Sequence, residues 1–167
     1  MRTRPHLFAA MLLSALPVVA GDGIQKGKYN VIEVAKFELA PGIDLPPEFQ
    51  ESLSEDVLKQ LEHTRKFNQV LGPGQQPSDA GAARLKLAGT VIKFKPGSRA
   101  TRYLVGFGAG ATKIVANIRF IDGNSGTVLL ERKVDGKVII GVFGGDSKGA
   151  ANGLAKELAK VTKSRFF

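Results

Sequence analysis

The chain has no cysteine and no tryptophan, and its histidines are limited to His6 and His63. The absence of cysteine excludes disulfides, thiolate zinc sites, iron–sulfur clusters and cysteine nucleophiles. His63 follows Glu62 in an acidic segment. A histidine in such a segment is commonly a solvated surface residue and rarely a catalytic base. The sequence therefore predicts no catalytic residue, no metal ligand and no cofactor, and we expect a protein that is not an enzyme.

Strong compositional bias is also absent. The 167 residues are 43% hydrophobic and 23% charged, a composition too apolar for a disordered basic tail and too ordinary for a low-complexity array. A chain of this length commonly forms one domain. We expect a single domain over residues 21–167, with a loop rich in turn-forming residues at 72–83.

The first 20 residues have the layout of a secretory signal peptide. Arg2 and Arg4 give a positive start, and an apolar run follows at residues 7–16. Val18 and Ala20 are small residues suited to cleavage before residue 21. The run is shorter than the roughly 20 residues that a spanning helix needs. We therefore expect an exported protein that is periplasmic or associated with the outer membrane, and without cysteine we expect no lipid anchor.

The spacing of apolar residues predicts two helices and several strands. Strands are expected over residues 29–39, 67–71, 84–95, 112–121, 127–134 and 137–143. Helices are expected from Pro46 to Phe67 and after a cap at Asp146 or Ser147. Asp135 and Gly136 are expected to form a turn, and the change of alternation in the strand at 84–95 predicts a twist or bulge near Gly89. The order predicts an α+β fold, a two-layer sandwich in which two amphipathic helices pack on a largely antiparallel sheet of about five strands.

Two glycine-rich segments invite comparison with anion-binding loops. Gly106, Gly108 and Gly110 precede a strand pattern, whereas a phosphate loop needs a helix directly after its glycines, so we expect either a loop or a bulged strand edge there. The second segment does precede a helix, and its possible anion ligands are Gly144, Gly145, Ser147 and Lys148. A strand-to-helix turn needs glycines and a cap in any case, and the intervening Asp146 repels anions. The alternative function at residues 144–149 is that of a small ligand-binding protein or hydrolase.

Acidic and basic residues are concentrated in different segments of a chain with a formal charge of +9. Residues 44–62 hold six acids and one base, a pattern typical of a solvated helix face. Residues 84–119 contain no acid and eight bases: Arg84, Lys86, Lys93, Lys95, Arg99, Arg102, Lys113 and Arg119. The excess positive charge is therefore a local feature of this part of the chain.

The middle of the acid-free stretch is the predicted contact region. Its candidate contact residues are Lys93, Lys95, Arg99, Arg102, Tyr103 and Phe107. Bases beside an apolar, glycine-rich loop suit an anionic lipid surface, peptidoglycan or an envelope protein. A solvated hairpin with a buried second half explains the same pattern equally well. Nucleic acid is not expected, because the protein is predicted to be exported and its aromatic residues form no stacking platform. The oligomeric state is left open.

A family resemblance rests on the same part of the chain. The matching residues are Arg102, Tyr103, Gly106, Phe107, Gly108, Ala109, Gly110, Asp122 and Gly126. This pattern resembles the bacterial family called domain of unknown function 4410, over residues 87–163 in detail and over the first strand and helix more loosely. The resemblance implies an exported envelope protein, often a lipoprotein, and brings no established activity. This sequence departs from lipoproteins because it has no cysteine to carry the lipid.

Overall fold

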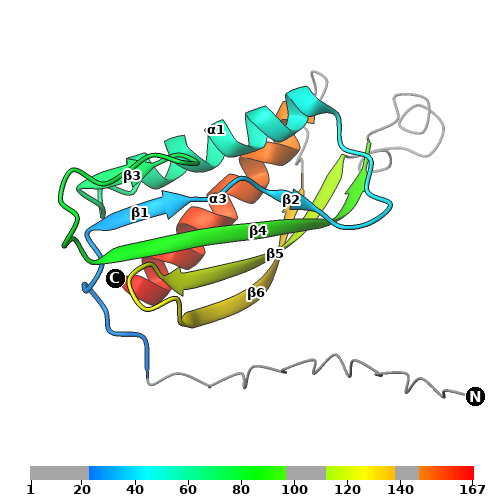
Figure 1. Ribbon diagram of the computed structural model, residues 1–167. Helices are drawn as coiled ribbons and strands as arrows, with labels where there is room; N and C mark the ends of the chain where they lie inside the picture. Colours follow the sequence, from blue (N-terminus) through cyan, green and yellow to red (C-terminus); the bar gives the residue numbers. More distant parts are fainter. Residues whose placement is uncertain (1–22, 97–111, 138–146) are drawn as a thin grey trace, which may run out of the picture.

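The computed structural model describes residues 23–96, 112–137 and 147–167 (Figure 1). Its strands are β1 (Val31–Val34), β2 (Glu38–Leu39), β3 (Gln69–Leu71), β4 (Arg84–Lys95), β5 (Lys113–Asp122) and β6 (Val128–Lys137). Its helices are α1 (Pro47–His63) and α3 (Ser147–Phe166). The expected signal peptide, the glycine-rich segment at 106–110 and most of the expected strand at 137–143 lie outside the described residues.

The sheet has the strand order β3-β1-β4-β5-β6, and β2 also pairs with β4. The predicted α+β class and the two helices are confirmed. The sheet is mixed where a largely antiparallel one was expected, because β1 runs parallel to both β3 and β4, and β2 runs parallel to β4. Helix α1 returns the chain from β1 to β3, as parallel neighbours require. Because β3 is only three residues long, the loop at residues 72–83 spans a short distance from the end of β3 to the start of β4, which lies beside β1.

The first expected strand, residues 29–39, is divided in the structure into β1 and β2. Phe37 lies between them and is 1% exposed, with its ring against the backbone of Gly89 on β4. A Cβ at residue 89 would overlap that ring. Gly89 therefore serves close packing by Phe37, and the bulge expected near it occurs further along β4, between Val91 and Lys93.

Helices α1 and α3 lie side by side on one face of the sheet (Figure 1). Helix α1 buries Phe49, Leu53, Val57 and Leu61, which are the four residues of its predicted apolar stripe. Helix α3 buries Leu154 and Leu158, and its alanines at 150, 151, 155 and 159 are buried as well. Small side chains allow a helix to approach its neighbours closely. The covered face of the sheet therefore forms one continuous core with both helices.

The expected turn at Asp135 and Gly136 is wrong, since both residues continue β6. Gly136 pairs with Ile114 on β5, and a Cβ at residue 136 would lie 2.8 Å from the Ala150 carbonyl oxygen of α3. Glycine is therefore needed in β6 at the point where the first turn of α3 packs against the strand. This packing outweighs the local preference of the Asp-Gly sequence for a turn. None of the described helices is long and apolar enough to cross a membrane.

Candidate functional site

The two faces of the sheet have different surroundings. One face is covered by α1 and α3, whereas in the described part of the chain no helix packs on the other face (Figure 1). We call this second face the outer face. Successive residues of a strand point to opposite sides, so Leu85 and Leu87 face the core while Arg84 and Lys86 belong to the outer face. At the β3 end, Val31 and Leu71 are covered by Ala82 from the loop before β4.

The outer face collects basic side chains from three neighbouring strands. We define the basic sheet face as Arg84, Lys86, Lys93, Lys95, Lys113, Arg119 and Lys133. Cross-strand pairing places them together, because Lys95 lies opposite Lys113 and Lys133 lies opposite Asn117, two residues from Arg119. All six described bases of the acid-free stretch at 84–119 belong to this face. Strand alternation and one bulge in β4 therefore place the bases of this segment on one surface.

The bulge in β4 is what brings Lys93 and Lys95 to this face. Before the bulge Val91 is buried and pairs with Ala116, and after it Lys93 pairs with Val115. Shifting a strand by one residue exchanges its two faces. Without the extra residue in the bulge, Lys93 would point to the core. With the bulge, Phe94 points to the core instead, and its ring centroid lies 5.0 Å from the ring centroid of Phe49.

Acidic neighbours neutralise only part of the basic sheet face. Glu33 on β1 lies 3.5 Å from Arg84 Nη1 and 3.8 Å from Lys86 Nζ, and Asp135 lies 3.7 Å from Lys113 Nζ. Such partly exposed pairs contribute little to stability. Four exposed bases of this face form no ion pair with another described residue: Lys93, Lys95, Arg119 and Lys133. These four side chains are accessible to a partner, and the exposed Glu131 of β6 lies opposite Arg119.

Of the contact residues predicted from sequence, the structure places Lys93 and Lys95 together on the basic sheet face. Arg99, Arg102, Tyr103 and Phe107 lie outside the described residues. The sequence interpretation missed Arg119 and Lys133 as members of the same surface. The alternation of β5 and its pairing with β6 contain the signal that identifies them.

The second predicted site is described only at its helical end. Gly144 and Gly145 lie outside the described residues, and helix α3 begins at Ser147, followed by Lys148. His63 is the last residue of α1 and is exposed. Within the described ranges, no group of three or more histidine, aspartate or glutamate side chains is arranged to hold a metal ion.

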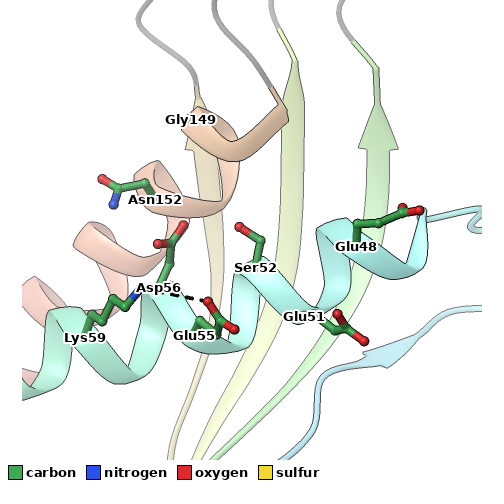
Figure 2. A pocket seen from close by; sticks show the side chains of 8 residues that line it. All are labelled: Glu48, Glu51, Ser52, Glu55, Asp56, Lys59, Gly149 and Asn152. Atoms are coloured by element: carbon green, nitrogen blue, oxygen red, sulfur yellow. Dashed lines mark ion pairs between the residues drawn. The ribbon is translucent and has the colours of Figure 1, made fainter.

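A hollow of about 580 Å³ lies between α1 and the first turns of α3 (Figure 2). Its lining residues are Glu48, Glu51, Ser52, Glu55, Asp56, Lys59, Gly149 and Asn152. Asp56 points toward Asn152 across the hollow, and burial raises the pKa of its carboxyl. Glu55 pairs with Lys59 at 3.8 Å, as expected for exposed side chains one helical turn apart. The surface of α1 is therefore acidic on the side of the molecule opposite the basic sheet face.

Asp122 at the end of β5 forms the best-connected polar cluster. Its Oδ2 accepts hydrogen bonds from Lys28 Nζ at 2.8 Å and from the Tyr29 hydroxyl at 2.9 Å. Its Oδ1 accepts the backbone N–H groups of Asn124 and Ser125, both at 3.0 Å. The Lys28 ammonium and these donors hold the pKa of Asp122 well below its usual range. Because each carboxylate oxygen is fully engaged, the cluster fastens the chain before β1 to the turn after β5.

Solved structures with the same fold include the PelC dodecamer from Paraburkholderia phytofirmans. The TM-score is 0.57 at 14% identity, over 83% of this chain and 92% of that one. Protein XCC0632 from Xanthomonas campestris has a TM-score of 0.54 at 17% identity, over 84% and 88% of the two chains. Hypothetical protein CT253 from Chlamydia trachomatis has a TM-score of 0.50 at 12% identity over 81% and 94%. No curated protein sequence matches the chain at a significant level.

The model of one protein family matches residues 35–153, a range that includes α1, all of the antiparallel part of the sheet and the first turns of α3. The family is described as a domain of unknown function, DUF4410. The matched range contains every member of the basic sheet face and the Asp122 cluster's carboxylate. The resemblance found in the sequence is thereby confirmed, and the chain belongs to the DUF4410 family.

Proposed function

We propose that this protein is an exported bacterial envelope component that binds or assembles without catalysing a reaction, and that the basic sheet face holds an anionic surface. The observation that carries the proposal is the gathering of all six described bases of the acid-free stretch on the outer face. The signal-peptide layout of residues 1–20 supports export. The same fold occurs in the PelC dodecamer, which supports a use of this fold in assembly.

Electrostatics favours an anionic partner over a neutral one. Each lysine or arginine held near an anionic membrane contributes about 1 kcal/mol of attraction, which decays within a Debye length of roughly 10 Å. Lys93, Lys95, Arg119 and Lys133 present four such charges from a rigid sheet. A rigid array loses less side-chain and backbone entropy on binding than a loop does. We therefore expect binding that weakens strongly with added salt.

The test compares two variants that lose the same charge. K93Q/K95Q/R119Q/K133Q removes four charges from the basic sheet face, and K156Q/K160Q/K163Q/R165Q removes four exposed charges from α3. Cosedimentation is measured with phosphatidylglycerol vesicles, with neutral vesicles and with peptidoglycan sacculi, at low and high salt. We expect the first variant to bind anionic vesicles or sacculi at least about tenfold more weakly than the wild type.

The α3 variant is the matched control, because a response to net charge alone would weaken both variants equally. We expect it to bind nearly as well as the wild type, since its changes lie on the helical side of the molecule. Equal loss in the two variants, or no loss in the sheet variant, would contradict a role for the basic sheet face. The vesicle and sacculus arms distinguish lipid headgroups from the cell-wall polymer.

A further inference from the structure

We infer that the anionic surface held by the basic sheet face is the acidic surface of α1 on a second copy of this chain, so that copies associate head to tail. The inference rests on the proposed function, since it takes the basic sheet face to be a binding surface. It adds the identity of the partner, which is the protein itself.

The acidic residues of the chain are concentrated on α1 and the residues just before it. Six of the 15 acids lie in residues 44–62, against one base. The exposed members are Asp44, Glu48, Glu51, Glu55 and Glu62, and we call them the acidic helix face. The neighbouring helix α3 instead exposes Lys156, Lys160, Lys163 and Arg165, with Glu157 as its exposed acid. Of the two helices, α1 therefore carries the negative surface.

The two charged faces lie on opposite sides of the same molecule. Helix α1 covers the core side of the sheet (Figure 1), and the basic sheet face belongs to the other side by strand alternation. A two-fold dimer that paired either face with itself would place like charges together. Pairing the acidic helix face of one copy with the basic sheet face of the next brings opposite charges together. Such a head-to-tail contact repeats, and it closes into a ring when the rotation between copies permits.

The shape of the acidic helix face suits lysine side chains. Three of its carboxylates, those of Glu48, Glu51 and Glu55, line the hollow of about 580 Å³ beside α3, where Lys59 pairs with Glu55 (Figure 2). Lys93 and Lys95 on the basic sheet face have long flexible stems that can deliver their ammonium groups into such a hollow. A membrane would engage the basic sheet face too, but it would leave the acidic helix face in contact with solvent. A second copy uses both surfaces.

The test uses charge reversal on each face. K93E/R119E/K133E reverses the basic sheet face, and E51K/E55K/E62K reverses the acidic helix face while keeping Glu48, whose carboxylate favours the first turn of α1. Sedimentation velocity and light scattering measure the mass of the protein lacking residues 1–20. We expect the wild type to associate at low salt and to dissociate as salt is added, and each reversed variant to be monomeric.

Two further samples make the outcome specific. The first is an equimolar mixture of the two reversed variants. In it, the negative sheet face of one variant can pair with the positive helix face of the other, and the unchanged helix face of the first can pair with the unchanged sheet face of the second. We therefore expect association to return in the mixture, and equally in one chain that carries all six reversals. Circular dichroism checks that each variant is folded. K156E/K160E/K163E reverses three bases on α3 and is expected to associate like the wild type.

A wild type that stays monomeric at low salt over the accessible concentrations would overturn the inference. A mixture and a six-fold variant that both stay monomeric would overturn it as well. If the wild type is monomeric and still binds anionic vesicles through the basic sheet face, the proposed function stands and its partner is the membrane. If the wild type associates through these two faces and binds neither vesicles nor sacculi, the partner is the second copy alone.

Discussion

Replacing Asp122 by alanine is expected to lower the free energy of unfolding by about 2–3 kcal/mol. The substitution leaves the buried Tyr29 hydroxyl without its acceptor and removes the acceptor of two backbone N–H groups in the turn after β5. It also removes the ion pair with Lys28, whose side chain is 43% exposed and contributes less for that reason. Urea denaturation of the wild type and variant at neutral pH measures the difference.

The pH dependence of the free energy of unfolding provides a second test of the Asp122 cluster. Since the pKa of Asp122 is lowered in the folded protein, its stabilising contribution is complete above the ordinary aspartate range and is lost as the pH falls below about 4. The difference in unfolding free energy between wild type and D122A should therefore shrink on acidification. D135N is the matched control, because Asp135 is exposed and pairs only with Lys113 among the described residues. A D122A variant as stable as D135N would contradict the structural role of the cluster.

Replacing Gly136 by alanine is expected to destabilise the fold by about 3 kcal/mol, at the upper end for overpacking by one methyl group. The new Cβ would lie 2.8 Å from the Ala150 carbonyl oxygen, from Ile114 Cγ2 and from Leu154 Cβ. The carbonyl oxygen belongs to the backbone of α3, so it cannot move aside without displacing the helix from β6. Thermal and urea unfolding followed by circular dichroism measure the loss.

Gly81 provides the control for this substitution. A Cβ at residue 81 would meet the Asp79 carboxylate oxygen at 3.4 Å, and the residue lies in the exposed loop before β4. We expect G81A to change the free energy of unfolding by no more than about 0.5 kcal/mol. If G136A were as stable as G81A, the close approach of α3 to β6 would be wrong.

Local patterns were sufficient to predict the helices and the class of the fold. The stripe of Phe49, Leu53, Val57 and Leu61 specifies both the helical period and the face that is buried. Strand pairing is different, because a four-residue strand such as β1 carries no local signal that selects β3 and β4 as parallel neighbours. The turn expected at Gly136 was wrong for a related reason. The residue that makes glycine necessary there, Ala150, belongs to another element, α3.

The candidate site was predicted only in part. The acid-free stretch identified Lys93 and Lys95, and the change of alternation along β4 predicted a bulge near Gly89. The structure places the bulge at Val91–Lys93, where it turns both lysines toward the same side as Arg119. The exact place of a bulge depends on the register with the neighbouring strand, which the alternation of one strand does not define. Lys133 lies outside the acid-free stretch and joins the surface only through the pairing of β5 with β6.

Occupancy of the basic sheet face in the envelope is the most direct test of this account. Because the chain has no cysteine, a single introduced cysteine reports on one surface. N117C lies on β5 between the bases of the basic sheet face, and K160C lies on the exposed side of α3. Maleimide labelling is compared between the purified protein at high salt and isolated envelopes. We predict that N117C becomes protected in envelopes while K160C stays reactive; equal reactivity of N117C in both samples would contradict the account.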